Sequence, residues 1–400
     1  MLSILLAIFT LYILIKISLS FIQIRYILQK KDARAVLLEQ DHYKEAADYA
    51  IAKEKLSLVS YSLDYALFLW WALFGFGILY SFSHLQFSEF WASIIFLFGY
   101  FALEYIITLP ISVYQVFYLD KRFGFSKITP KIFFQDQIKS ILMFILLGFA
   151  LFSLLIWVID SFELWWFYAF LIMMAIILVI NFLYPTIIAP LFNKFTPLDD
   201  EVLREKIEAL MVQAGMKANG VFVMDASKRD GRLNAFFGGI GKSKRVVLFD
   251  TLLEKLDHSE LIAVLGHELG HFRNGDIWKN ILLMSILVFL AFFILGNIPL
   301  ELYSELGVAP IAGVKIALIL ILFPLISFVW MPIISLFSRG HEYKADEYGS
   351  SVGGKEKLVS ALLKLVSENR SFPLSHPLFV FFYYSHPPIV QRVQKLGFEV

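Results

Sequence analysis

The sequence predicts a mainly α-helical, multi-pass membrane protein with seven transmembrane helices and two structured segments on the inner side. Hydrophobic residues make up 58% of the 400 residues and charged residues only 17%, with a mean hydropathy of +0.70. A typical soluble chain is about 45–50% apolar and about 25% charged. Seven apolar stretches are long enough to cross a bilayer, and Lys and Arg alternate between their connections. The net charge of +1 offers no general attraction for nucleic acid, so no nucleic-acid partner is expected.

Each membrane helix is predicted from about 20 consecutive apolar residues, the length that crosses the hydrocarbon core. The first stretch has neither a basic leading region nor a cleavage site of small residues, so we interpret it as an anchor and not as a signal peptide. Four ionisable residues inside these stretches indicate a polar cavity or partner, or snorkelling for the two lysines: Lys16, Asp64, Glu104 and Lys315. The seven stretches lie near 2–24, 60–82, 91–116, 140–159, 164–186, 280–298 and 314–336.

The distribution of Lys and Arg predicts the topology. The segments 25–57, 119–139, 193–279 and 337–400 hold 33 of the 35 Lys and Arg residues. The short connections near 83–90, 160–163 and 299–313 hold none. This alternation follows the positive-inside rule for seven helices, and it places the N-terminus outside and the C-terminus inside.

The two long inner segments are large enough to fold, which divides the chain into 1–192, 193–279, 280–336 and 337–400. In the first of them, Pro197 to Asp200 is a capping signal before an amphipathic helix. A Gly-rich stretch between two β-like runs predicts an edge or bulged strand. The expected elements are a helix over Glu201–Gly215, strands at Val221–Met224, 234–239 and Arg245–Phe249, and a helix from about Ser259 to Arg273.

The C-terminal segment is predicted to be helical in three places. Helices are expected around Glu342–Ser350 and Lys355–Glu368, and a last helix begins near Pro387. A loop punctuated by proline separates the second from the third. The chain has no cysteine, which excludes disulfides, thiolate catalysis and Cys-ligated metal.

The chemistry is concentrated in the motif His267-Glu268-Leu269-Gly270-His271. Residues i and i+4 share one face of a helix, so His267 and His271 can offer two nitrogens to one metal ion. Glu268 lies beside them, close enough to take a proton from a water at the metal. The alternative is an amphipathic helix with exposed histidines, which a second polar cluster near residue 342 disfavours.

Two histidines are too few for a catalytic zinc, which usually has three protein ligands and one open position. A third His in the extended HExxH pattern would stand at position 277, which is Ile277. A Glu from a later helix is the other option, and Glu342 provides one, with His341 as the competing ligand. Asp346 shares a helical face with Glu342, and it can accept the free ring N–H of a ligand histidine. Both clusters lie near membrane helices, so the metal is expected at the inner boundary of the membrane.

HExxH followed by Glu-Tyr-x-Ala-Asp resembles the integral-membrane zinc metalloproteases called type I CAAX prenyl endopeptidases. The resemblance covers nearly the whole chain, and seven spans is also the number in that family. Its motifs match this sequence at Leu109-Pro110, Gly124-Phe125-Ser126, Pro190–Phe195, Ser227-Lys228-Arg229, Asn234-Ala235-Phe236 and Ser385-His386-Pro387-Pro388, with Arg392 following.

The resemblance implies a gluzincin-type zinc protease domain, made of helices and a small β-element, on the inner side of a chamber that the seven helices enclose. It implies one zinc per chain, bound by His267, His271 and Glu342, which would polarise the scissile carbonyl and activate a water. Glu268 would act as the general base and then protonate the leaving amine.

The remaining implied roles concern the substrate. His386 would donate a hydrogen bond to the oxyanion, and Arg392 would support or contact the same site. Asn234, Ala235 and Phe236 would pair with the backbone of an extended substrate. Simpler alternatives are a helix start at His386, a purely structural strand and a surface ion pair at Arg392. His376 is a second Ser-His-Pro, but it has neither the following Pro nor the Arg.

The predicted function is a zinc endopeptidase that cuts membrane-associated peptides, with a C-terminally prenylated CAAX-type substrate implied by the resemblance. The short chain and the absence of an endoplasmic-reticulum retention signal at Val400 favour a bacterial inner membrane, with the active site facing the cytoplasm. An HtpX-like quality-control protease is the alternative, although it has fewer spans. A channel or transporter with a structural metal is the non-enzyme alternative. A site-2 protease is excluded, because HExxH here lies among polar residues.

Overall fold

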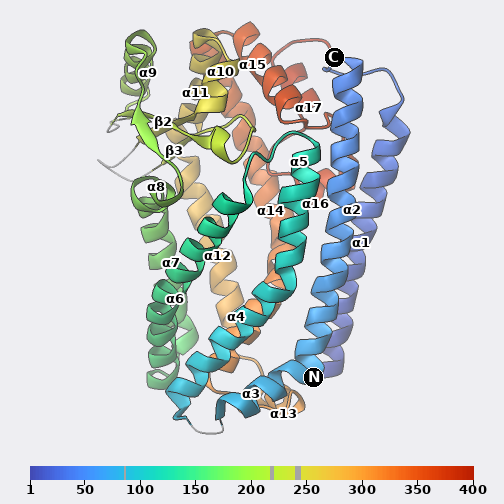
Figure 1. Ribbon diagram of the computed structural model, residues 1–400, viewed down its shortest axis with the longest axis vertical. Coiled ribbons are helices and arrows are strands. Elements are labelled where there is room, and N and C mark those ends of the chain that lie inside the picture. The colour runs from blue at the N-terminus through green and yellow to red at the C-terminus, as the bar shows by residue number, and fades with distance from the viewer. Residues whose placement is uncertain (85–86, 217–219, 239–244) are drawn as a thin grey trace.

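The computed structural model describes residues 1–84, 87–216, 220–238 and 245–400. Long helices form a tall bundle, and most of the smaller elements gather at the end that carries the C-terminus (Figure 1). Within the described residues, seven helices are long and apolar enough to cross a membrane, which confirms the predicted number. These seven helices run over Leu2–Lys31, Gln40–His84, Glu89–Arg122, Pro130–Ser161, Trp165–Phe192, Asp276–Gly296 and Ala312–Gly353.

Three of these spans contain π-helical turns that divide them into labelled pieces. The turns lie at Trp71–Gly75, Gln115–Leu119 and Tyr184–Ile188. The membrane pieces are α1 (Leu2–Lys31), α2 (Gln40–Trp70), α3 (Phe76–His84), α4 (Glu89–Tyr114), α5 (Asp120–Arg122), α6 (Pro130–Ser161), α7 (Trp165–Leu183), α8 (Ala189–Phe192), α12 (Asp276–Gly296) and α14 (Ala312–Gly353). The other helices are α9 (Glu201–Gln213), α10 (Asp250–Lys255), α11 (His258–Arg273), α13 (Leu300–Glu305), α15 (Lys355–Glu368), α16 (Pro377–Tyr383) and α17 (Ile389–Lys395).

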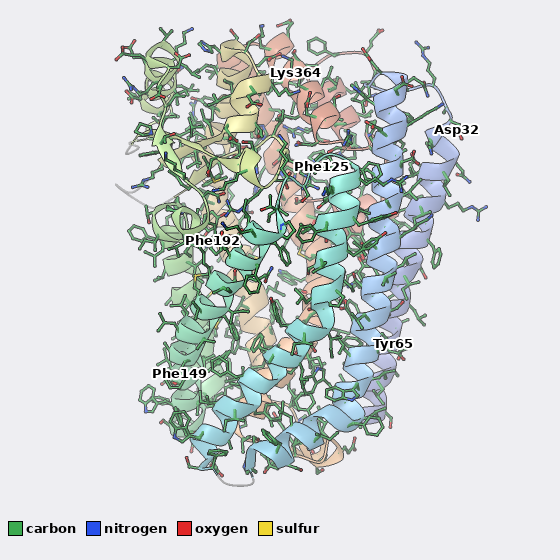
Figure 2. The ribbon with its side chains drawn as sticks, viewed as in Figure 1. Asp32, Tyr65, Phe125, Phe149, Phe192 and Lys364 are labelled. Carbon is green, nitrogen blue, oxygen red and sulfur yellow. The ribbon has the colours of Figure 1, made fainter. Side chains whose placement is uncertain are left out.

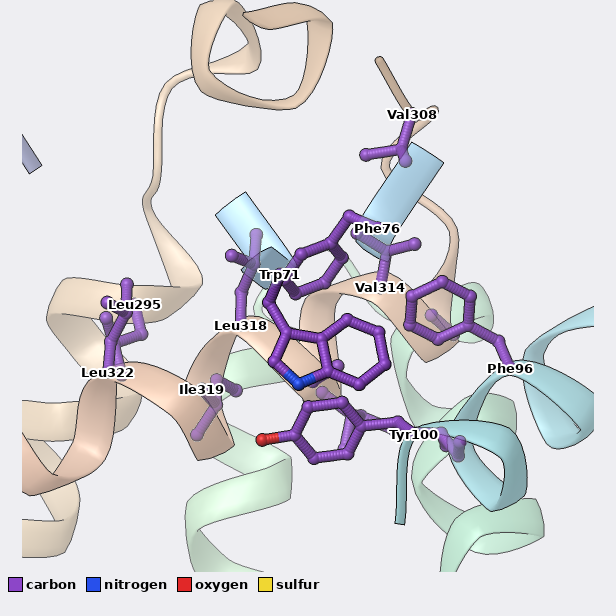
Figure 3. Packing of buried hydrophobic residues seen from close by; sticks show 14 of the residues in the cluster. Trp71, Phe76, Phe96, Tyr100, Leu295, Val308, Val314, Leu318, Ile319 and Leu322 are labelled. Carbon is purple, nitrogen blue, oxygen red and sulfur yellow. The ribbon is translucent and has the colours of Figure 1, made fainter. Parts of the chain in front are cut away.

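The bundle is joined by aromatic packing at the end opposite the sheet. Trp71 is fully buried, with its ring centroid 4.8 Å from that of Tyr100 and 5.8 Å from that of Phe76 (Figure 3). Away from this core, apolar side chains such as Phe149, which is 41% exposed, face outward along the helices, and charged groups such as Lys364 lie at the sheet end (Figure 2). This is the distribution expected for a protein surrounded by lipid.

Three of the four ionisable residues within the spans lie against aromatic rings. Glu104 accepts a hydrogen bond of 2.6 Å from the indole N–H of Trp71. The ammonium of Lys16 lies 3.9 Å from the ring centroid of Tyr61, and that of Lys315 lies 5.5 Å from the ring of Trp165. These cation–π contacts give both lysines a partner inside the bundle.

A four-stranded sheet with strand order β1-β2-β4-β3 lies toward the end of the bundle that carries the C-terminus (Figure 1). The strands are β1 (Phe195–Pro197), β2 (Val221–Met224), β3 (Ala235–Gly238) and β4 (Arg245–Phe249). β2 and β4 are parallel, and the outer strands pair antiparallel to them. The predicted strands 221–224 and 245–249 are present at those residues, and β3 is an edge strand. Residue 239 of the predicted Gly-rich strand lies outside the described residues, and β1 was not predicted from the sequence.

The sequence interpretation missed two features of the C-terminal part. α14 is one continuous helix of 42 residues, so the last span extends without a break into the segment that carries Glu342. Pro324 and Pro332 lie within this helix. The proline-punctuated loop contains the short helix α16, whose first residue is Pro377. The division of the chain at 192, 279 and 336 remains a prediction.

Candidate metal centre

The helix that carries both histidines, α11, begins with a reciprocal cap. The backbone N–H of Glu260 donates to the Asp257 carboxylate at 2.8 Å, and the backbone N–H of Asp257 donates to the Glu260 carboxylate at 2.9 Å. The buried carboxylate of Glu260 also accepts from Lys364 at 2.7 Å and from Ser360 at 2.6 Å, both on α15. This network satisfies the first backbone donors of α11 and holds its start against α15.

Glycines allow α11 and α14 to approach each other at backbone distance. A Cβ atom added to Gly349 would lie 2.8 Å from the backbone nitrogen of His267 and 2.9 Å from the carbonyl oxygen of Ala263. One added to Gly270 would lie 2.8 Å from Cα of Ala345. Only hydrogen fits at these positions, so the glycines determine how close the Glu342 side chain comes to the two histidines.

Three side chains from these two helices converge on one point. Nε2 of His267 is 3.5 Å from Oε2 of Glu342, and Nε2 of His271 is 3.1 Å from Oε1. The three potential ligand atoms all lie within 4.8 Å of one another. His341 is not part of this group, and its Nε2 is 3.7 Å from an oxygen of Asp276.

Both histidines have a carboxylate on the opposite side of the ring. Nδ1 of His267 is 2.8 Å from Asp346, and Nδ1 of His271 is 3.1 Å from Asp276. Each of these carboxylates can accept a hydrogen bond from Nδ1, which is the arrangement that supports a metal-binding histidine. In a neutral ring with the hydrogen on Nδ1, the Nε2 atom would present its lone pair to the point of convergence.

The residues fit a divalent cation. Oε2 of Glu342 is buried and has no hydrogen-bond partner among the described residues. Burial by itself disfavours the imidazolium of His271, but the Glu342 carboxylate outweighs it and, with Asp276, raises the pKa of His271 to about 9. A metal ion would therefore displace the proton of His271 on binding. Two imidazoles and one carboxylate are the donor set of a hydrolytic metal site.

Glu268 and His386 lie at the same centre. Glu268 directly follows His267 on α11 and is half-buried, and its carboxylate has no hydrogen-bond partner in the described part of the chain. Nε2 of His386 is 3.3 Å from Oε1 of Glu342, and its side chain is 63% exposed. His376 instead caps α16, where its ring accepts from the backbone N–H of Leu378 at 3.2 Å. The structure therefore brings His386, and not His376, to the cluster.

Arg392 from α17 holds the carboxylate behind His267. Its Nε and Nη2 donate to the two oxygens of Asp346 at 2.8 and 2.6 Å. Nη1 is 3.4 Å from Oε2 of Glu342. Arg392 is only 9% exposed, and its guanidinium is directed at these carboxylates. This geometry is that of a positioning residue that fixes Asp346 and, through it, the His267 ring.

β3, the strand expected to bind the substrate, lies beside α11, the helix that carries His267 and His271. β3 pairs with β4 through Ala235 and Phe236, which lie opposite Leu248 and Val247, and its other edge is unpaired among the described residues. β3 also packs against α11. Asn234 is exposed just before the strand, with its side chain accepting from the backbone N–H of Ala235 at 2.8 Å.

The segment before β3 is tied to the membrane helices by two arginines. Arg229 makes a two-point ion pair with Asp136 at the start of α6, at 2.8 and 3.0 Å. Arg232 donates to Asp120 at 2.9 Å, and the hydroxyl of Tyr49 on α2 donates to the same carboxylate oxygen at 2.7 Å. Paired, partly buried contacts of this kind fix the orientation of the strand relative to the bundle.

Sequence reasoning missed Asp276 and the glycine contacts. Asp276 follows His271 by five residues, across a helix break at Gly275, which has φ = 68°, so no helical periodicity connects the two. The glycines did carry a signal. Gly266 and Gly270, like Gly349 and Gly353, are spaced i, i+4, which places small residues on one helical face and predicts a close helix crossing.

The chain matches two family models that together span most of its length. Residues 23–194 match the model described as CAAX prenyl protease N-terminal, five membrane helices, and residues 197–399 match Peptidase family M48. CAAX prenyl protease 1 homolog from Dictyostelium discoideum is 38% identical over 301 residues, 73% of this chain and 70% of the relative. CAAX prenyl protease 1 from Saccharomyces cerevisiae is 34% identical over 320 residues, 74% and 70% of the two chains. The crystal structure of S. mikatae Ste24p superposes with a TM-score of 0.90 at 29% identity, covering 99% of this chain and 98% of that one.

Proposed function

This chain belongs to peptidase family M48, with a CAAX prenyl protease N-terminal region, and on that premise we propose that it is a zinc endopeptidase for C-terminally prenylated peptides. The family makes it a membrane metallopeptidase. The observation that carries the finer proposal is the convergence of His267, His271 and Glu342, with Nε2 of both rings within 3.5 Å of the Glu342 carboxylate. Two imidazoles and one carboxylate suit zinc and leave a coordination position for a water.

The remaining residues have distinct roles in this proposal. A zinc ion held by the three ligands would supply Lewis-acid polarisation of the scissile carbonyl and a water that ionises near neutral pH. Glu268 would take the proton of the attacking water and deliver it to the leaving amine. His386, whose ring lies beside the Glu342 carboxylate, would donate a hydrogen bond to the developing oxyanion.

The substrate backbone is proposed to add to the edge of the sheet. The free edge of β3 beside α11 offers Asn234 to Phe236 for backbone hydrogen bonds, as an exposed strand does in β-augmentation. Arg229 and Arg232 would keep this edge in register with the metal. Arg392 would act through Asp346, by holding the His267 ring, and would not touch the substrate.

A prenylated substrate is proposed for two reasons. The relatives from Dictyostelium and yeast are named CAAX prenyl proteases. In addition, α14 passes from an apolar span to Glu342 without a break, so the metal would lie where a lipid-modified chain end reaches the protein. A chamber enclosed by the seven helices is part of this proposal.

The orientation of the chain in the membrane is proposed from the distribution of Lys and Arg. The segments that carry the site hold most of the Lys and Arg, so the site would face the cytoplasm. A bacterial inner membrane as the location remains a prediction.

The test uses the full chain purified in detergent, with metal content and peptide cleavage measured on the same sample. Wild type and Glu268→Gln are compared on a farnesylated C-terminal peptide and its unprenylated twin. We expect one zinc per chain in both proteins, and cleavage of the farnesylated peptide by wild type alone. Equal cleavage of both peptides would replace the prenyl proposal by a broader, HtpX-like specificity. Bound zinc with no cleavage of either peptide would favour a structural metal, and a metal-free wild type would overturn the ligand assignment.

A further inference from the structure

A cleft of about 650 Å³ opens between α2 and the inner end of the third span, away from the metal ligands. One wall is formed by α2 and the other by the end of α4, the following π-helical turn and α5. Its surface is mostly apolar, with Ala52, Val59 and Ile111 among the lining residues. None of the residues placed in the peptidase site lines it.

The cleft lies at the level where the membrane ends. Val59 and Ile111 fall at or near the ends of apolar stretches, whereas Lys55 and Arg122 lie beyond those ends on the inner side. Tyr114 and Tyr118 also line the cleft, are 45% and 56% exposed, and stack with ring centroids 5.0 Å apart. Exposed tyrosines are typical of the membrane–water interface. The apolar part therefore faces the hydrocarbon, and the charged mouth lies at the level of the lipid headgroups.

The mouth carries uncompensated positive charge. Lys55 and Arg122 are both exposed, and within the described residues neither has a carboxylate within 4 Å. The acidic residue of the cleft, Asp48, is already paired with Lys31 at 2.5 Å. Arg122 also lies 5.6 Å from the ring centroid of Phe123, a contact that leaves its charge without a counter-ion. Two cations without a carboxylate partner above an apolar groove are complementary to an anionic headgroup with an acyl chain.

We propose that this cleft binds one anionic phospholipid from the inner leaflet. Its phosphate lies between Lys55 and Arg122, and one acyl chain lies against Ala52, Val59 and Ile111. The acyl chain is part of the recognition, because the cations alone are exposed to water and bind a free phosphate weakly. This site is independent of the proposed peptidase chemistry.

Lipid in this cleft would also stabilise the fold. Leu119 and Phe123 form part of its wall, and both belong to the buried cluster around Tyr49. Tyr49 shares the Asp120 carboxylate with Arg232, two residues before Asn234. A lipid packed against this wall would raise the midpoint temperature of thermal unfolding, which gives a readout other than activity.

The test is native mass spectrometry of the full chain in a neutral detergent, with dioleoyl phosphatidylglycerol or dioleoyl phosphatidylcholine added. The double variant Lys55→Gln/Arg122→Gln removes the charges, and Ala52→Trp fills the groove while keeping them. As a control, Arg34→Gln/Lys44→Gln also removes one Arg and one Lys, but from exposed inner-side positions outside the cleft. Thermal unfolding in each lipid is measured in parallel.

Wild type and the Arg34/Lys44 control are expected to bind one phosphatidylglycerol and to unfold at a higher temperature with it. The Lys55/Arg122 variant should bind it roughly 25-fold more weakly, about fivefold for each cation, and Ala52→Trp should lose the bound lipid. Equal affinity of wild type and the Lys55/Arg122 variant would overturn the proposal, and so would equal binding of phosphatidylcholine. Competition by water-soluble glycerol phosphate at the same concentration would show an anion site without lipid and would also overturn it.

Discussion

The contact between α11 and α14 predicts that one methyl group can disrupt the metal centre. In Gly349→Ala, the added Cβ would lie 2.8 Å from the backbone nitrogen of His267 and 2.9 Å from the carbonyl oxygen of Ala263. Ordinary contact begins at 3.4 Å, so the helices must separate by about 0.6 Å, which exceeds the roughly 0.5 Å within which a site must be held. Both neighbours are backbone atoms and cannot rotate away. Overpacking of this kind costs about 1–3 kcal/mol.

The same helix offers a matched control. A Cβ added to Gly340 meets nothing within 4 Å, so Gly340→Ala should be neutral, or stabilising by up to about 1 kcal/mol through helix propensity. Metal content by mass spectrometry and the midpoint of thermal unfolding are measured for both variants. We expect Gly349→Ala to unfold at a lower temperature and to retain less than a tenth of the metal of wild type. If it keeps both at the level of Gly340→Ala, then the helix spacing does not determine the geometry of the centre.

Three further predictions concern the residues around the ligands. Asp276→Asn removes the carboxylate behind His271 and should weaken metal binding by roughly 10–100-fold in competition with a chelator; unchanged affinity would show that His271 needs no such support. Arg392→Gln removes the guanidinium from the buried Asp346 carboxylate, which keeps only the His267 ring, and should cost up to roughly 3–5 kcal/mol of folding free energy, whereas normal stability with a low kcat would indicate direct contact with the substrate. The hydrogen bond from Lys357 and that from the backbone of Glu260 lower the pKa of Asp257 to about 2. Its stabilisation of α11 should therefore be complete above about pH 4 and be lost as the pH falls through about 2, and Asp257→Asn should remove that dependence from pH-dependent unfolding.

Much of the architecture could be predicted because it depends on local patterns. Apolar stretches of about 20 residues and the alternation of Lys and Arg require no knowledge of contacts, and the structure confirms seven candidate spans. The strands at 221–224 and 245–249 are β-branched runs with clear ends, and the helix Glu201–Gln213 begins at the predicted cap. The Asp200 side chain accepts there from the backbone N–H of Leu203 at 2.9 Å.

The missed features depend on contacts between distant segments. The pairing of β1 with β2 is a property of the assembled sheet, since three residues that include Pro197 carry no strand signal of their own. The position of Arg392 behind Asp346 depends on how α17 packs, which no spacing in the sequence specifies. The glycine spacing indicates a close helix crossing, but it does not specify that Gly349 meets His267, which depends on how the two helices are placed.

The central claim is that His267, His271 and Glu342 hold one zinc ion. Zinc K-edge X-ray absorption of the purified full chain tests it most directly, because imidazole and carboxylate ligands scatter differently. We predict two imidazoles and one carboxylate at each zinc, with one zinc per chain, and loss of the zinc signal in Glu342→Ala. Three imidazoles at the zinc would mean that His341 or His386 replaces Glu342 as a ligand, and a chain without zinc would contradict the account as a whole.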